Sequence, residues 1–212
     1  MANAEALHIY TSLPDNLVRG ETYQVDVRLD STEFPDKQIS SANWRVYVPN
    51  FLTFVDAKLP YTNNPSDNPN DFYYTFLMDV PPYEEVSTTP IPSSNGPGYE
   101  LGLNSRSLAN PSNAPSNRIG NLENIFVRVN DDSPVGYRNP VNQPNNGINN
   151  PNNLGLFGAD MGDTNGDLYK YSSGNLTIFS PGFNVRSMYG DSDDDGDVDL
   201  TDLGLLAGNY ES

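Results

Sequence analysis

The 212-residue chain has no cysteine, one histidine (His8) and few basic residues. Without cysteine there can be no disulfide framework, no zinc–thiolate site and no cysteine nucleophile. A single histidine also excludes any site that needs two. Lysine and arginine number 11 against 28 aspartates and glutamates, so the net charge is −17. Such a chain repels nucleic-acid phosphates and anionic lipids, which makes both unexpected as partners and makes divalent cations its natural complement.

Long apolar runs are missing as well. No segment approaches the ~18 consecutive apolar residues of a membrane span, so membrane insertion is not expected. The N-terminus has no basic region followed by an apolar core, but Ala2-Asn3-Ala4 has the small-x-small pattern of a signal-peptidase site. Two interpretations stay open: the mature form of an exported protein, extracellular or at the cell surface, and an accidental alanine-rich terminus.

Short segments that alternate between apolar and polar residues dominate the sequence. In residues 22–29 every second side chain is apolar (Tyr23, Val25, Val27 and Leu29), which predicts a half-buried strand. We expect strands over residues 6–10, 22–29, 42–48, 51–59, 71–80, 99–103, 122–129, 154–159, 168–171 and 176–179. No helical pattern occurs before residue 199. The sequence therefore predicts an all-β fold, an antiparallel β-sandwich or jelly roll, over residues 1–181.

The segment from Asp191 to Asp202 has the spacing of a calcium loop. Carboxylates stand at positions 1, 3, 5, 9 and 12, and Gly196 stands at position 6, where the loop turns sharply. A merely solvated acidic run would need neither this glycine nor Val198, which we expect to tie the loop to the core. The predicted Ca²⁺ ligands are the carboxylates of Asp191, Asp193, Asp195 and Asp202, the backbone carbonyl of Asp197, and Asp199, which would act directly or through a water.

The segment that starts at Gly190-Asp191 and ends at Asp202-Leu203 resembles a dockerin repeat, in which a calcium loop with a closing Asp-Leu leads into an apolar helix. The resemblance implies a short C-terminal helix after the loop. Dockerins carry two such repeats, which pack against each other, whereas this sequence contains one. Residues 190–212 are thus predicted to be a half-dockerin after a linker at 182–189, and its helix must pack on its own sandwich or on a neighbouring molecule.

The remainder is similar, more loosely, to a cohesin, the β-sandwich partner of dockerins. The similarity lies in strand and turn patterns over residues 19–27, 39–55, 120–129, 134–136 and 174–178. It implies a cohesin-like sandwich that takes part in protein–protein docking.

A second acidic group comprises Asp160, Asp163, Asn165 and Asp167. One interpretation is a hairpin with Asn165-Gly166 at its tip, because Asn-Gly is a strong hairpin signal. The other is a second calcium site. The two interpretations are compatible.

Catalysis is not expected. Asp26, Glu84 or Glu85 could be nominated as paired carboxylates of a glycosidase, but their spacing does not select them. The expected function is an exported, calcium-binding structural or adhesion module that docks onto a protein partner or onto itself. A head-to-tail contact that does not close would produce a filament, and the first strand is a candidate arm for a neighbour's sheet. The alternative is a polysaccharide-binding module of a secreted assembly, with tyrosines such as Tyr73 and Tyr74 stacking on sugars.

Overall fold

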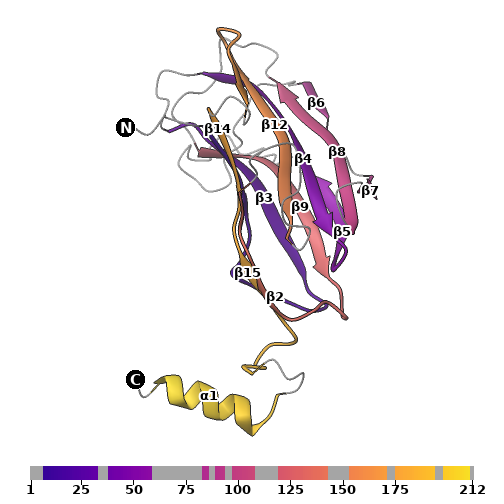
Figure 1. The fold of residues 1–212 in the computed structure, drawn as a ribbon, viewed down its shortest axis with the longest axis vertical. Coiled ribbons are helices and arrows are strands. Elements are labelled where there is room, and N and C mark those ends of the chain that lie inside the picture. The colour runs from indigo at the N-terminus through magenta and orange to yellow at the C-terminus, as the bar shows by residue number, and fades with distance from the viewer. Residues whose placement is uncertain are drawn as a thin grey trace, which may run out of the picture.

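The computed structural model describes residues 7–32, 38–58, 83–85, 89–93, 97–107, 119–142, 153–170, 175–193 and 198–210. Within these ranges the chain forms fifteen strands and one helix (Figure 1). The predicted all-β sandwich with a short C-terminal helix is confirmed. The strand predicted over residues 71–80 lies outside the described residues.

One of the two large sheets contains both the first strand and a late one. Its order is β11 (Val141–Asn142), β14 (Leu176–Ser180), β1 (Leu7–Ser12), β3 (Thr22–Asp30), β9 (Ile119–Val129) and β5 (Leu52–Lys58). Strand β1 pairs in parallel with β14 and antiparallel with β3. The first strand is therefore an interior strand of its own sheet, with Leu7 and Ile9 fully buried. The suggestion that it extends as an arm to a neighbour is wrong for this structure.

The second large sheet has the order β13 (Leu168–Lys170), β12 (Gly155–Asp163), β4 (Ile39–Pro49), β8 (Gly98–Ser107) and β6 (Tyr83–Glu85), and β7 (Ile91–Pro92) also pairs with β8. A third, small sheet has the order β10 (Gly136–Arg138), β15 (Phe183–Arg186) and β2 (Asn16–Val18). Strand β15 falls inside the predicted linker at 182–189. Phe183 and Val185 alternate with polar residues and are buried, so the sandwich extends to Arg186 and the linker prediction is corrected to the few residues after it.

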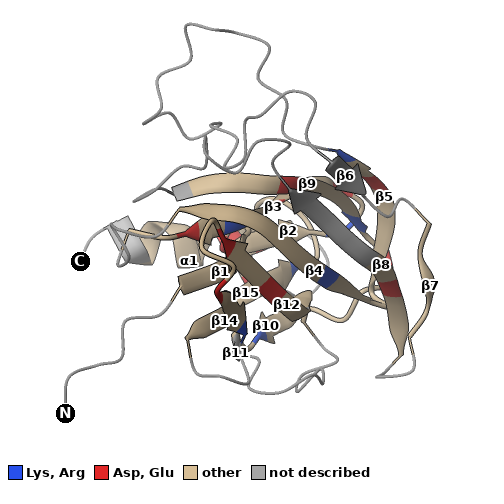
Figure 2. Cartoon of the chain, turned by 90° about the horizontal axis from the view of Figure 1, so that it is seen from above, with Lys and Arg blue, Asp and Glu red and all other residues tan. Residues whose placement is uncertain are grey.

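Apolar side chains from both large sheets form the core between them. The period of two dictates this arrangement, because successive side chains on a strand point to opposite faces. On β3, Val25, Val27 and Leu29 are fully buried as predicted, and Tyr23 packs against the edge of this core. Trp44 on β4 contributes the largest buried side chain from the opposite sheet. Charged residues of both signs lie on strands of the two large sheets (Figure 2).

Helix α1 (Leu200–Tyr210) lies beyond the end of the sandwich, at the far end of the long axis of the molecule (Figure 1). Its leucines are exposed, so it does not use its own sandwich as a packing partner. At eleven residues α1 is far too short to cross a membrane, and no other helix occurs in the described part of the chain.

Candidate calcium site

A tight turn after β15 leads the chain from the sandwich into the acidic loop. Gly190 has a φ of 90°, in the left-handed region that glycine adopts without strain. A Cβ atom at this position would lie 3.4 Å from Cγ1 of Val198. Val198 itself is half exposed and faces this turn, so the expectation that it ties the loop to the core is wrong.

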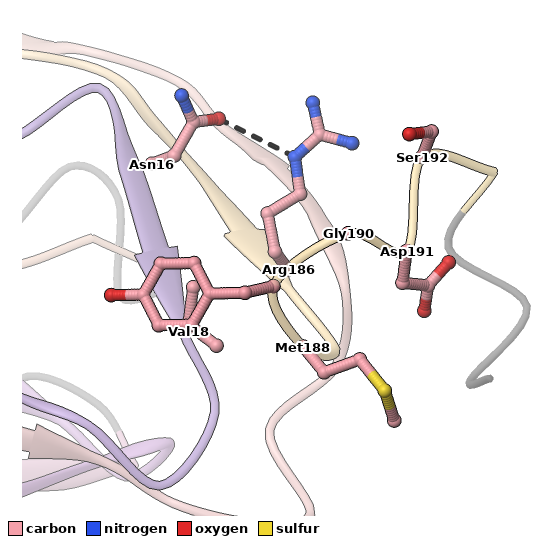
Figure 3. A pocket seen from close by; sticks show the side chains of 8 residues that line it. Asn16, Val18, Arg186, Met188, Gly190, Asp191 and Ser192 are labelled. Atoms are coloured by element: carbon pink, nitrogen blue, oxygen red, sulfur yellow. Dashed lines mark hydrogen bonds between the residues drawn. The ribbon is translucent and has the colours of Figure 1, made fainter. Parts of the chain in front are cut away.

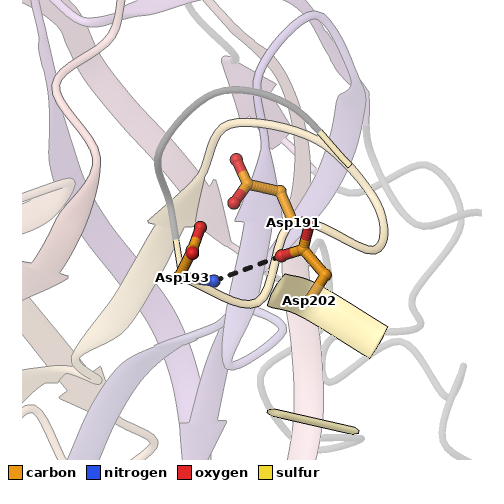
Figure 4. A group of neighbouring side chains, drawn as sticks. All are labelled: Asp191, Asp193 and Asp202. Atoms are coloured by element: carbon orange, nitrogen blue, oxygen red, sulfur yellow. Dashed lines mark hydrogen bonds between the residues drawn. The ribbon is translucent and has the colours of Figure 1, made fainter. Parts of the chain in front are cut away.

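Three predicted ligands come together at the end of this turn. Asp191, Asp193 and Asp202 each place a carboxylate oxygen so that all three atoms lie within 4.8 Å of one another (Figure 4). Asp191 and Asp202 are 4% exposed, while Asp193 faces solvent. Three negative charges at this separation repel one another, and a bound cation would offset that repulsion. Carboxylate oxygens at the loop's first, third and twelfth positions are donors that Ca²⁺ prefers.

Asp202 also closes the loop through hydrogen bonds. Its Oδ1 accepts the backbone N–H groups of Ser192 and Asp193, and its Oδ2 accepts the N–H of Asp199 at 2.7 Å. These amides, that of Asp199 foremost, hold the pKa of Asp202 below its ordinary value. The residue that ends the loop is thus connected to the loop's beginning, so the two ends of the candidate site are held together by one side chain.

Asp199 caps helix α1. Its Oδ1 accepts the N–H of Thr201 at 2.6 Å, while Asp202 reaches back to the N–H of Asp199. This reciprocal arrangement is a capping box, built here from two aspartates. Asp199 is therefore not one of the three clustered carboxylates, whereas Asp195 and Asp197 lie outside the described residues. The Asp-x-x-Asp spacing before an apolar run was a readable signal for this cap.

Ser187 is a site residue that the sequence did not reveal. Its hydroxyl donates to Oδ2 of Asp191, which orients this carboxylate from the segment between β15 and the loop. Tyr189 in the same segment hydrogen-bonds to Tyr23, whose hydroxyl accepts the N–H of Val18 at 2.8 Å. The loop is thereby connected to the base of the sandwich. No sequence pattern marks a serine four residues before a ligand as its partner.

A groove runs beside the loop at this junction. It has a volume of about 480 Å³ and is lined by apolar Val18, Met188 and Tyr189 together with Arg186 and Asp191 (Figure 3). Nε of Arg186 donates to the side-chain oxygen of Asn16 across 3.4 Å. The groove thus lies where strands β2 and β15 of the sandwich meet the candidate calcium site.

The second acidic group forms a hairpin between β12 and β13, which confirms that interpretation. Oδ1 of Asp163 accepts the N–H groups of Asn165 and Asp167, both at 2.9 Å, and its Oδ2 accepts the hydroxyl of Tyr169 at 3.0 Å. Asp160 accepts a hydrogen bond from Asn43 instead. Both carboxylate oxygens of Asp163 thus accept hydrogen bonds from residues of this hairpin. The second calcium site stays a prediction, and the one cluster of three or more acidic or histidine ligands in the described residues is the one at Asp191.

Comparisons with known proteins bear on the sandwich. No protein-family model matches the chain, and no curated sequence matches it significantly. A cohesin module from a Clostridium perfringens family 33 glycoside hydrolase has a similar structure, with a TM-score of 0.50 and 10% identity over 88% of this chain and 100% of that one. The sixth cohesin of Acetivibrio cellulolyticus scaffoldin B, solved with a Cel5 dockerin, has a TM-score of 0.49 and 12% identity over 86% of this chain and 99% of that one. CaCohA2 from Clostridium acetobutylicum has a TM-score of 0.49 and 16% identity over 85% of this chain and 91% of that one.

At 10% identity the likeness to the Clostridium perfringens module bears on the fold alone. The dockerin-like character of residues 190–212 rests on the sequence pattern. The chain therefore has a cohesin-like β-sandwich fold, with an acidic loop and a short helix that extend beyond it.

Proposed function

We propose that this chain is an exported, non-catalytic docking module whose C-terminal loop binds one calcium ion. The observation that carries the proposal is the meeting of Asp191, Asp193 and Asp202, although ten residues separate the first from the last. The 12-residue spacing of the sequence predicts the same three ligands. The clustering supports a cation site, and the all-oxygen donor set favours Ca²⁺ over softer metals.

Calcium would act on the geometry of the helix as well as on charge. Asp202 is both the closing carboxylate of the loop and the third residue of helix α1. A cation held by Asp191 and Asp202 would fix the beginning of α1 relative to the turn at Gly190. Calcium would therefore set the direction in which α1 leaves the sandwich. That role suits a docking element, because a preordered surface loses less entropy on binding.

A protein partner, or another copy of the chain, is the ligand that this architecture supports. The cohesin-like fold is consistent with docking, and the exposed leucines of α1 supply a surface that nothing in the chain covers among the described residues. Filament formation would require copies to join head to tail without closing. The polysaccharide alternative has no supporting observation, since Tyr73 and Tyr74 lie outside the described residues.

Thermal unfolding in calcium and in chelator tests the calcium part of this proposal. A ligand that binds only the folded state raises its stability, so calcium should raise the melting temperature. Asp193→Ala should remove most of that increase. Asp132→Ala is the matched control because Asp132 is an exposed acid remote from the loop in sequence. Equal responses of Asp193→Ala and the unmodified chain to calcium would contradict the assignment of the site.

A further inference from the structure

Helix α1 presents an apolar face to solvent. Leu200, Leu203 and Leu206 recur every three residues and so lie along one side of the helix. They are 83%, 62% and 53% exposed, respectively. A helix of this length is marginal in water by itself, because most helical stability in proteins comes from packing of an apolar face. This face therefore has the character of an interaction surface.

A second exposed apolar surface lies at the end of the sandwich, in the segment that precedes the loop. Met188 and Tyr189, in the segment that leads into the loop, are also exposed and line the 480 Å³ groove together with Val18. Figure 3 shows Arg186 extending toward Asn16 and Met188 extending away from it, with Asp191 beyond Gly190 in the same segment. Along the chain, the candidate calcium loop thus comes between the residues of the groove and the apolar face of α1, and Asp191, which lines the groove, clusters with Asp202 of α1.

The charge around helix α1 indicates the chemistry of its partner, whereas the groove is lined by one basic and one acidic residue, Arg186 and Asp191. From Asp191 to Ser212 eight of 22 residues are Asp or Glu, and none is Lys, Arg or His. This tenth of the chain therefore carries −8 of the total charge of −17. One bound Ca²⁺ would leave −6. Exposed apolar residues in such an environment are complementary to apolar residues surrounded by positive charge.

The same charge disfavours a second copy as the occupant. A second α1 would bring another −8 toward the first, and the groove is bordered by Asp191 itself. Like charges placed opposite each other across an interface repel and so suppress wrong partners.

We infer that helix α1 and the adjacent groove form a docking surface for a basic, apolar-faced segment of another protein. The inference rests on the proposed docking function and names the chemistry of its partner. Leu200, Leu203 and Leu206 contact the apolar side of that segment, and its lysines or arginines lie against the acidic loop. Calcium holds α1 in position, and the negative charge that the ion leaves uncompensated attracts the partner.

Fluorescence anisotropy with synthetic peptides tests this inference on the full chain in calcium. The probe is an amphipathic peptide with leucine at i, i+3, i+4 and i+7 and lysine at its polar positions. One comparison peptide carries glutamate in place of lysine, and another carries serine in place of leucine. We expect the lysine–leucine peptide to bind at least about tenfold more tightly than either one, with an affinity that falls as salt rises.

Substitutions separate apolar docking from simple charge attraction. Leu203→Ser with Leu206→Ser leaves every charge in place and should weaken binding of the lysine–leucine peptide at least about tenfold. Val55→Ser with Ile91→Ser is the matched control, because these two sandwich residues are 52% and 53% exposed and should not affect binding. Equal binding by the Leu203/Leu206 variant would overturn the inference, as would equal binding of the glutamate peptide, no binding at all, or calcium-dependent self-association in light scattering.

The melting temperature of the same samples in calcium and in chelator is read independently. A calcium response without peptide binding would contradict the docking surface alone. Peptide binding without any calcium response would contradict the calcium site and leave the docking surface supported.

Discussion

Trp44 donates its indole N–H to Oε2 of Glu123 across 2.6 Å, and this bond joins the two large sheets inside the core. Both side chains are fully buried. The other oxygen of Glu123 has no hydrogen-bond partner among the described residues. Burial raises the pKa of Glu123 to about 7, and the bond from Trp44 lowers it only in part.

The raised pKa of Glu123 predicts that the contribution of this residue to the free energy of unfolding falls as pH rises. Between about pH 4.5 and pH 7 the folded state keeps a proton that the unfolded state has lost, so deprotonation favours unfolding. Above pH 7 the free energy of unfolding has lost the whole contribution of protonated Glu123, which amounts to about 3 kcal/mol. Glu123→Gln keeps an acceptor for Trp44 and removes the titration. Denaturant unfolding should show this variant gaining stability over the unmodified chain as pH rises from 5 to 8; a difference that does not change with pH would refute the assignment.

Asp163 is predicted to stabilise the β12–β13 hairpin without any metal. Asp163→Asn keeps acceptor capacity on one oxygen but replaces the other by an NH₂ group, so it disrupts the bonds to Asn165 and Asp167 or the one to Tyr169. We expect a loss of about 1–3 kcal/mol in unfolding free energy, equal in calcium and in chelator. Asp132→Asn is the control, because Asp132 is an exposed acid remote from this hairpin in sequence. A loss confined to calcium buffer would instead support the second calcium site.

Gly190→Ala should destabilise the turn before the loop, whereas Gly204→Ala should stabilise helix α1. Gly190→Ala places a Cβ at a φ of 90°, a conformation that L residues rarely adopt, so it should strain the turn by about 1–2 kcal/mol and weaken calcium binding. Gly204→Ala lies within α1 with open space around it and should raise helicity, because alanine is favoured over glycine by about 1 kcal/mol. Calcium titration and far-UV circular dichroism measure the two effects. Similar calcium affinities for both variants would show that the Gly190 turn does not position the site.

The capping box predicts how α1 behaves without calcium. Asp199→Ala removes the acceptor for the N–H of Thr201 and should destabilise the helix start by about 1 kcal/mol. Amide hydrogen exchange in α1, measured in chelator, should then become several-fold faster. Thr201→Ala is the control because the bond uses the backbone of Thr201. Unchanged exchange in the Asp199 variant would mean that the cap does not hold the helix.

The sequence predicted those parts of the fold that repeat a pattern over many residues. Strand β3 has four apolar residues at period two, and its location was predicted almost to the residue. Strands β2 and β10 have three residues each, and β15 has only two buried apolar positions. Such short strands are stabilised by pairing with one another, which a linear pattern does not show, so β15 was assigned to a linker.

The candidate site was predictable to the same extent. The spacing of Asp191, Asp193 and Asp202 predicted that their carboxylates would cluster, because the ligands of a calcium loop lie within one short segment of sequence. The contact of Ser187 with Asp191 depends on how the turn is folded, and the pairing of Trp44 with Glu123 joins residues 79 positions apart. Neither has a local sequence signal.

Calorimetric titration of the full chain with calcium tests the central claim most directly. The account predicts binding of one ion at the loop, lost on Asp195→Ala, which removes a predicted ligand, and retained on Asp132→Ala. Absence of binding by the unmodified chain, or undiminished binding by Asp195→Ala, would contradict it.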